Sequence, residues 1–416
     1  MRILWLSHLV PYPPKAGVLL RAYNLLRETS RYHDVSLFAF VQESWIRRFY
    51  PDLEVGVQET REKLGEFCTI SGYSAIPWER RTGGRFMLPA VSAMGGQCYT
   101  VRWLASAEAR RQLQRIAAEE NYDLVHFDTI SLAQYRDCFG RTPCSLGHHN
   151  IESHMMLRRS ELSGNPFKRL YFYQEGRRLQ KYERTTADRF KVHITCSALD
   201  SERLRELVPE SRIVDVPNGV DIDYFKHDSA RPVVMNSIVF VGTMDWYPNV
   251  KAMEWFIEEV WPKLVTRRPG VTLGVVGSNP PESLRPLAAQ TEGITVYGYV
   301  DDVRPYIQGA ELYVCPIFDG GGTKLKLLDA FAMKKCVLAH PVAVEGINAT
   351  DGVDICLAST ADEYVKAIVD LLDRPDERSR IGSAARDLAE NEYSFSALGR
   401  KFSDVLESSA EPAMEG

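Results

Sequence analysis

Short apolar runs typical of buried strands alternate with helix-like segments along nearly the whole of this 416-residue chain. In the first half they lie at residues 3–7, 34–40, 123–127, 145–149 and 193–196. The rhythm restarts after residue 236, with runs at 238–242, 271–277, 294–297, 311–317, 336–340 and 354–358. Alternation of this kind predicts parallel sheets with helices on both faces. We therefore expect an α/β protein with two Rossmann-like, doubly wound domains.

The length also favours two domains, because one core usually stops growing below 416 residues. A turn-rich segment at 216–221 and a polar run at 226–229 mark the boundary. We expect an N-terminal domain over 1–220, a linker over 221–236 and a C-terminal domain over 237–392. A final helix over 393–416 would cross back to the N-terminal domain and end in a frayed tail. Ligands bind beyond the carboxyl ends of such strands, so the two domains should face each other across a cleft.

Composition limits the location and the partners. The net charge of −5 gives no general attraction to nucleic acid, so no nucleic-acid partner is expected. The N-terminus lacks a signal-peptide pattern, no apolar window is long enough to span a bilayer, and the eight cysteines form no CxxC pair. No His/Cys cluster has the spacing of metal ligands. These features predict a cytoplasmic protein with reduced thiols and no metal.

Basic residues cluster locally within residues 158–184, where they are interleaved with aromatic residues. The cluster consists of Arg158, Arg159, Lys168, Arg169, Arg177, Arg178, Lys181 and Arg184. Two interpretations stay open. The segment is either a solvated helix whose charges simply face water, or a site of peripheral contact with a membrane surface or a charged acceptor.

A glycine turn with two lysines follows the apolar run at 311–317. Residues 320–326 read as a turn into a helix, and the helix N-terminus with its lysines suits a phosphate. Plain turn chemistry is the alternative, because glycine runs before helices are common. The order of residues matches neither a Walker A loop nor G-x-G-x-x-G. An anionic ligand is the first hypothesis.

Several separated segments carry a family resemblance in their order along the chain. They are the Pro-rich loop ending at Gly17, the His149–Asn150 pair, residues 216–221 with Phe225, and, in the second half, 240–242, 276–277, 298–300, 322–333 and 336–338. Together they resemble the retaining family-4 glycosyltransferases of the GT-B fold. The resemblance implies transfer of a sugar, with its anomeric configuration kept, from a nucleotide diphosphate sugar held by the C-terminal domain. The acceptor, bound by the N-terminal domain, would be a glycan, a lipid-linked molecule or a small molecule. Neither a metal nor another cofactor is implied.

The resemblance also implies roles for single residues. Lys326 is the expected phosphate-facing catalytic cation, with Lys324 as the runner-up, and His149 is expected to face the donor sugar near the reacting carbon. Gly17 would let the backbone approach the donor from the other domain. The remaining expected donor-binding residues are Gly242, Thr243, Asn249, Tyr299, Val300, Asp319, Gly320, Gly321, Gly322, Thr323, Leu325 and Asp329.

This chain departs from the family pattern at four positions. Gly321 stands where the first acid of the E-x7-E motif is usual, and Asp329 stands where the second, a longer glutamate that grips the ribose, is usual. Thr243 and Asn249 replace an arginine and a lysine that contact phosphate in many relatives. The charge at the diphosphate is therefore reduced, which raises the importance of Lys326 and leaves Lys251 as a substitute.

The departures keep two other functions open: a non-catalytic sugar-nucleotide-binding protein and a sugar-nucleotide epimerase on the same fold. The base, the sugar and the acceptor cannot be read from the residues.

Overall fold

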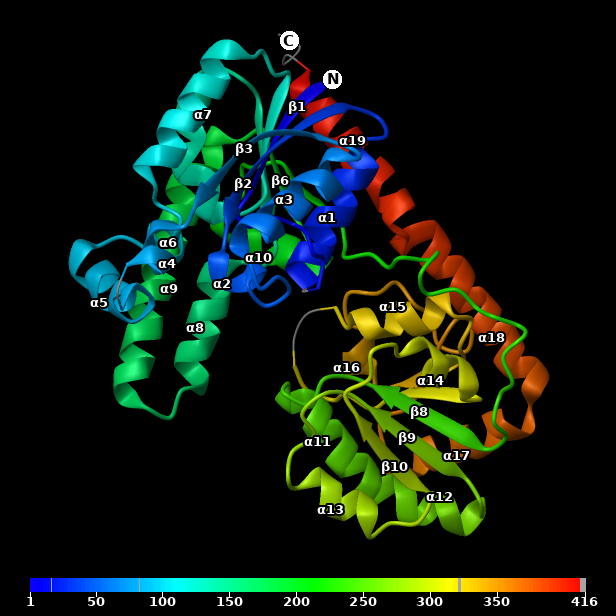
Figure 1. The fold of residues 1–416 in the computed structure, drawn as a ribbon. Coiled ribbons are helices and arrows are strands. Elements are labelled where there is room, and N and C mark those ends of the chain that lie inside the picture. Colours follow the sequence, from blue (N-terminus) through cyan, green and yellow to red (C-terminus); the bar gives the residue numbers. More distant parts are fainter. Residues whose placement is uncertain (16, 82, 321–322, 412–416) are drawn as a thin grey trace. The chain divides into compact units, whose positions relative to one another are not determined.

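The computed structural model describes residues 1–15, 17–81, 83–320 and 323–411, and the chain forms two compact units. The first unit contains Met1–Pro217 together with the residues from Leu398 onward, and the second contains Asn218–Ala397. Figure 1 shows that each unit has a sheet flanked by helices.

The first unit contains a seven-stranded parallel sheet in the order β3-β2-β1-β4-β5-β6-β7. Its strands are β1 (Arg2–Ser7), β2 (Asp34–Val41), β3 (Thr69–Ala75), β4 (Leu124–Phe127), β5 (Cys144–His148), β6 (Val192–Thr195) and β7 (Ile213–Asp215). Ile3 of β1 lies opposite Val35 on one side and Leu124 on the other. The strand order therefore reverses between β1 and β4, and such a switch point is where doubly wound sheets bind ligands.

Apolar residues on both faces of this sheet explain why its strands read as continuous hydrophobic runs. Ile3 and Trp5 point into a core beneath α1 (Gly17–Thr29), α3 (Leu53–Gly65) and α19 (Phe395–Ala410). Leu4 and Leu6 point into the opposite core, beneath α7 (Ala107–Glu119) and the 3₁₀ segment η1 (Ile130–Phe139). Phe402 of α19 packs against Trp5 with ring centroids 5.4 Å apart. The C-terminal helix thus supplies one wall of the N-terminal core.

A helical hairpin extends from the first unit in Figure 1. It consists of α8 (Glu152–Leu162) and α9 (Pro166–Thr186), and Gly176 lets the helices approach, since an added Cβ there would lie 2.8 Å from Leu157 Cγ. The remaining elements of this unit are α2 (Glu43–Ile46), α4 (Pro77–Arg80), α5 (Gly84–Gly95), α6 (Tyr99–Trp103), η2 (Ala187–Arg189) and α10 (Ala198–Leu207).

The second unit contains a six-stranded parallel sheet in the order β10-β9-β8-β11-β12-β13. Its strands are β8 (Ser237–Val241), β9 (Thr272–Val276), β10 (Ile294–Gly298), β11 (Leu312–Cys315), β12 (Val337–Ala339) and β13 (Cys356–Leu357). Its helical elements are α11 (Tyr247–Trp255), η3 (Phe256–Val260), α12 (Trp261–Arg267), α13 (Leu284–Ala289), α14 (Arg304–Gly309), α15 (Leu325–Ala332), α16 (Pro341–Val344), α17 (Ala361–Asp373), α18 (Pro375–Leu388) and η4 (Ala389–Tyr393). In strand order this is the dinucleotide-fold sequence 3-2-1-4-5-6, with its switch point between β8 and β11.

The predicted α/β class with two doubly wound sheets is confirmed. The edge strands β3 and β7 were not predicted, because both are largely half-exposed and neither carries a long apolar run. The units divide between Pro217 and Asn218, whereas the sequence suggested a linker over 221–236. Arg386 of the second unit donates hydrogen bonds to the carbonyls of Ile222 and Phe225, which attaches the start of that segment to the second unit. The predicted cleft between the domains stays a prediction, and residues 412–416 of the expected frayed tail lie outside the described residues.

Candidate functional site

A lysine and an amide meet at the switch point of the second sheet. Lys326 lies in the first turn of α15, and its Nζ donates a hydrogen bond to Asn249 Oδ1 at 2.5 Å. The Asn249 amide in turn donates to the carbonyl oxygen of Thr243 at 2.6 Å. Gly242 directly follows β8 beside this pair, and a Cβ at that position would collide with the Lys326 ammonium. A glycine is therefore required there for the lysine to reach the strand end.

The Lys326 ammonium is a half-buried cation. Its Nζ lies 4.8 Å from the ring centroid of Phe240 and 5.8 Å from that of Trp246. Among the described residues, no carboxylate oxygen lies within 4.0 Å of it. Burial lowers the pKa of Lys326 to about 8, and the Lys324 charge acts in the same direction. A desolvated ammonium next to a neutral amide and two rings is suited to receive an anion.

The turn before α15 is fixed by its own side chains. The Asp319 carboxylate accepts hydrogen bonds from the Tyr247 hydroxyl at 2.8 Å and from the Gly320 N–H at 2.6 Å. Gly320 has a φ of +98°, and a Cβ there would lie 2.9 Å from Pro248 Cγ. The buried Lys324 donates to the Gly320 carbonyl at 2.7 Å. Lys324 therefore holds the turn, which leaves Lys326 better placed to meet a ligand.

Asp329 lies three residues after Lys326, on the same face of α15. Burial raises the pKa of its carboxyl group to about 7, although the Lys326 charge opposes the increase. No side chain or backbone N–H among the described residues hydrogen-bonds to this carboxyl group. An acid held in such an environment has free acceptor capacity for hydroxyl groups.

The other expected donor-binding residues divide into three groups. Thr243 follows β8 and bonds to Ser278 after β9, with 3.0 Å between the hydroxyl oxygens, while Thr323 lies against Gly346. The Leu325 side chain and Val300 pack against the core, while Tyr299 is exposed after the edge strand β10 and makes no described contact with Lys326. Gly321 and Gly322 lie outside the described residues. Lys251 is exposed and pairs with Glu254 at 3.2 Å, and its role as a substitute phosphate cation stays a prediction.

Four neighbouring strands of the first sheet end in a row of polar groups. The residues are His8 after β1, Asp128 after β4, His149 after β5 and Cys196 after β6. Asp128 accepts from His149 Nε2 at 3.1 Å and from His8 Nδ1 at 2.9 Å. Gly147 permits this approach, because a Cβ there would lie 2.7 Å from the Asp128 carbonyl oxygen.

The neighbours of His149 in this row favour its protonated form. Burial alone would lower the pKa of His149, but the Asp128 carboxylate and the nearby Cys196 sulfur raise that pKa to about 10. Burial also opposes ionisation of Asp128, yet the two imidazoles hold the pKa of Asp128 well below its ordinary value. His149 is therefore an imidazolium paired with a carboxylate at neutral pH. The ligand atoms of His8, Asp128 and His149 lie within 4.8 Å of one another, a spacing that a metal ion could also use, so the expectation of no metal stays a prediction.

Two family models match the chain, one for each unit. The model described as "Glycosyltransferase Family 4" matches residues 96–224, and the model described as "Glycosyl transferases group 1" matches residues 235–374. The chain belongs to the group 1, family 4 glycosyltransferases.

Curated relatives match about half of the chain. A phosphatidyl-myo-inositol mannosyltransferase of Mycolicibacterium smegmatis is 28% identical over 47% of this chain and 52% of its own length. An uncharacterized protein of the cps region of Klebsiella pneumoniae is 21% identical over 55% of this chain and 58% of its own length. The chain thus spans about half the length of the curated relatives it matches.

Solved structures match over nearly the whole chain. HepE of Anabaena in complex with UDP has a TM-score of 0.62 and 14% identity, and the match covers 98% of this chain and 100% of that one. Sucrose-phosphate synthase of Thermosynechococcus elongatus has a TM-score of 0.64 and 13% identity, covering 98% and 99%. At these identities the matches show the fold alone, which is the GT-B fold.

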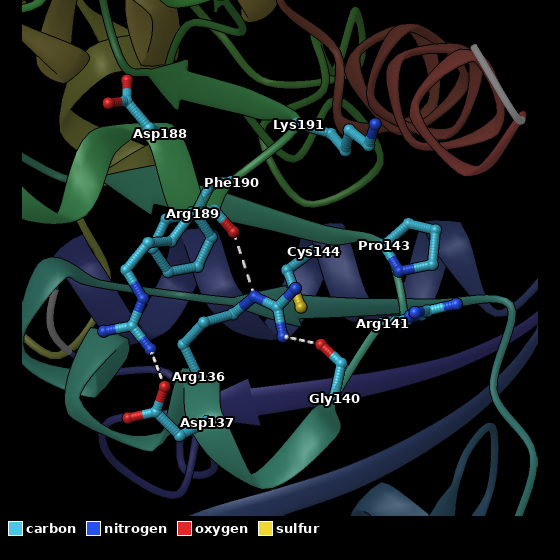
Figure 2. Close-up of a pocket in the computed structure, with 10 residues that line it drawn as sticks. All are labelled: Arg136, Asp137, Gly140, Arg141, Pro143, Cys144, Asp188, Arg189, Phe190 and Lys191. Atoms are coloured by element: carbon cyan, nitrogen blue, oxygen red, sulfur yellow. Dashed lines mark hydrogen bonds and ion pairs between the residues drawn. The ribbon is translucent and has the colours of Figure 1, made fainter.

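A pocket at the opposite edge of the first sheet does not fit the family's site. It encloses about 420 Å³ at the amino ends of β5 and β6 and is lined by Arg136 and Arg189 among others (Figure 2). Arg136 donates to the carbonyls of Arg189 and Gly140, and Arg189 pairs with Asp137. These cations are already occupied, and ligands of doubly wound sheets bind at the carboxyl edge.

Sequence reasoning did not single out His8 and Asp128, which the structure places beside His149. Each is a single polar residue directly after an apolar strand, and this position was the available signal. Gly17, which was predicted, begins α1, and a Cβ there would meet no atom within 4 Å. Packing therefore does not require a glycine at position 17, which leaves its role in donor approach as a prediction.

Proposed function

We propose that this protein is a retaining glycosyltransferase that moves a sugar from a nucleotide diphosphate sugar to an acceptor without a metal ion. One observation carries the proposal. A half-buried lysine with no counter-ion among the described residues lies at the switch point of a dinucleotide-type sheet, in the first turn of a helix. This combination of a fixed cation and free helix N–H groups fits a diphosphate.

The chemistry gives Lys326 a definite role. Negative charge grows on the leaving nucleoside diphosphate as the glycosidic bond breaks, and preorganised positive groups stabilise that charge in the transition state. Asn249 holds the Lys326 ammonium at the strand end before the donor binds. Asp329 would accept hydrogen bonds from the donor ribose hydroxyls, which its free carboxyl oxygens allow.

His149 would face the donor sugar near the reacting carbon. Asp128 fixes its ring through Nε2 and keeps it charged, and His8 occupies the second oxygen of the same carboxylate. An imidazolium held in this way is a second preorganised positive group. Asp128 and His8 are positioning residues in this scheme, because they act through His149.

The donor base stays open. HepE was solved in complex with UDP, and a relative from Corynebacterium glutamicum is described as GDP-mannose-dependent, so both nucleotides belong in a donor screen. We propose Thr243 and Asn249 as polar surroundings of the diphosphate, and Asp319 together with the backbone of Gly320 and Thr323 as hydrogen-bond partners of the donor sugar. The acceptor is unidentified.

We also propose peripheral contact with a membrane through residues 158–184, with the protein in the cytoplasm. None of the helices in the described part of the chain is long and apolar enough to cross a bilayer. The contact would therefore be made at the membrane surface.

Incubation with UDP-sugars and GDP-sugars tests the proposal. Release of free nucleoside diphosphate supports the transferase. Binding without release would instead support a non-catalytic sugar-nucleotide-binding protein, which the replacement of basic residues by Thr243 and Asn249 keeps open. Conversion to an isomeric donor would support an epimerase.

A further inference from the structure

The exposed surface of the α8–α9 hairpin has a charge opposite to that of the whole chain. The chain carries −5, whereas residues 158–184 contain eight basic and three acidic residues. Seven of the eight bases are exposed, but two of the three acids are buried, which leaves Glu161 as the exposed acid. The surface offered to a partner is therefore strongly cationic.

Structural contacts explain why Glu175 and Glu183 are absent from this surface. Glu175 is 1% exposed and accepts from the Tyr99 N–H, and Glu183 is 2% exposed and accepts from the Ser153 N–H at 3.2 Å. Both carboxylates therefore serve the fold, facing the body of the unit. Seven of the eight bases face solvent, whereas Arg178 is half-buried and lies 4.0 Å from the Glu175 carboxylate.

The tip of the hairpin is apolar where a solvated helix would be polar. Phe167 is 84% exposed and Leu162 is 73% exposed, on either side of the short connection between the helices. Asn165 caps α9 by accepting from the N–H groups of Phe167 and Lys168, so the tip is an ordered turn. Exposed apolar residues within a basic rim are typical of segments that enter the membrane interface.

A groove lies between the two helices of the hairpin, and Pro166 at the start of α9 is part of its wall. It encloses about 600 Å³, and it is also lined by the apolar Leu157, Leu170 and Tyr173, by the bases Arg169 and Arg177, and by one acid, Glu161. Gly176 and the hydrogen bond from Ser160 Oγ to the Arg169 carbonyl, at 2.9 Å, hold the helices together beside it. An apolar wall next to guanidinium groups matches a molecule that has both an acyl chain and a phosphate.

We propose that this hairpin binds the anionic phospholipids of a membrane, with Leu162 and Phe167 entering the interface and Arg169 and Arg177 meeting lipid phosphates in the groove. The inference rests on the proposed peripheral contact and names its lipid class and its residues. Charge complementarity selects the occupant, because a neutral bilayer or an apolar protein surface would leave seven exposed bases without a counterpart.

Vesicle co-sedimentation of the full chain tests the proposal. Binding to phosphatidylcholine vesicles containing phosphatidylglycerol should be strong at low salt and fall as salt rises, with little binding to phosphatidylcholine alone. Leu162→Ser with Phe167→Ser should weaken binding about tenfold or more. Arg169→Ala with Arg177→Ala should weaken binding about tenfold for the anionic vesicles.

Matched controls remove the same groups elsewhere. Val55→Ser with Met235→Ser removes two exposed apolar side chains, and Arg111→Ala with Arg115→Ala removes two exposed bases of the same unit. Both control pairs should bind as the unaltered chain does, and circular dichroism should show all variants folded.

Three results would overturn the inference. Equal binding to neutral and anionic vesicles would refute the preference for anionic phospholipids. Absence of binding to both kinds of vesicle would also refute the membrane contact. Binding of millimolar inorganic phosphate by the chain, without vesicle binding, would mean a site for free phosphate. None of these results depends on sugar transfer, so each is separable from failure of the catalytic proposal.

Discussion

Replacing Lys326 with methionine should make the unliganded protein more stable while removing its affinity for nucleoside diphosphates. Methionine keeps much of the length of the side chain and removes the charge. The difference between the ordinary lysine pKa of 10.5 and the value of about 8 here corresponds to about 3 kcal/mol at most. Because Lys326 is partly exposed, we expect a gain of about 1 to 3 kcal/mol at pH 7.

The stability gain in Lys326→Met should depend on pH. The folded-state pKa of Lys326 is lowered, so the charged side chain destabilises the unliganded fold below pH 8, and this cost disappears as the pH rises from about 8 to 10.5. The stability difference between Lys326→Met and the unaltered protein should therefore be largest at pH 7 and close near pH 10.5. Urea unfolding at the two pH values measures it.

The affinity for a nucleoside diphosphate should also depend on the protonation of Lys326. A bound diphosphate would restore the lysine pKa toward 10.5, so affinity in the unaltered protein should fall about 30-fold between pH 7 and pH 9.5. Proton uptake should accompany binding near pH 8, which calorimetry in two buffers of different ionisation enthalpy detects. Lys326→Arg keeps the charge and is the control. Equal stability of Lys326→Met and the unaltered protein at every pH, or undiminished affinity in Lys326→Met, would refute the reasoning.

Other residues of the site give separate expectations. Asp329→Asn should weaken nucleotide binding in titration calorimetry, and equal affinity would remove Asp329 from the ribose site. The same substitution should stabilise the unliganded fold above pH 7, because the pKa of Asp329 is raised to about 7. Asp128→Asn should lower the His149 pKa in NMR titration, because burial then acts without the opposing carboxylate, and should lower stability at pH 7 by about 3 kcal/mol, because it breaks a buried pair. The part of that stability loss due to His149 is fully present below pH 6.5 and disappears as the pH rises through 10. The part due to Asp128 disappears as the pH falls below 3.8 toward the lowered pKa of Asp128. An unchanged His149 pKa would contradict the pairing. Lys326→Ala should lower turnover about 100-fold in a nucleoside diphosphate release assay, and unchanged turnover would exclude Lys326 from the mechanism.

The sheet strands that carry the site were predictable because their signal is local. A buried parallel strand such as β1 or β8 must be apolar on both faces, so it appears in the sequence as a short continuous run. The edge strands β3 and β7 have only partial cover, and their residues carry no such pattern.

Contacts between residues far apart in the sequence were harder to predict. Thr243 and Asn249 were recognised as neutral replacements for basic residues, but the hydrogen bond from Lys326 to Asn249 depends on how the start of α11 meets α15. Similarly, His8 and Asp128 are 120 positions apart, and only the strand order β1-β4-β5 brings them beside His149.

Titration calorimetry of UDP and GDP against the unaltered protein and Lys326→Ala tests the central claim most directly. The claim is that the second unit holds a nucleoside diphosphate at Lys326. It predicts saturable binding of one nucleotide per chain for at least one of the two, weakened tenfold or more in Lys326→Ala. Binding that is unaffected by Lys326→Ala, or no binding of either nucleotide, would contradict it.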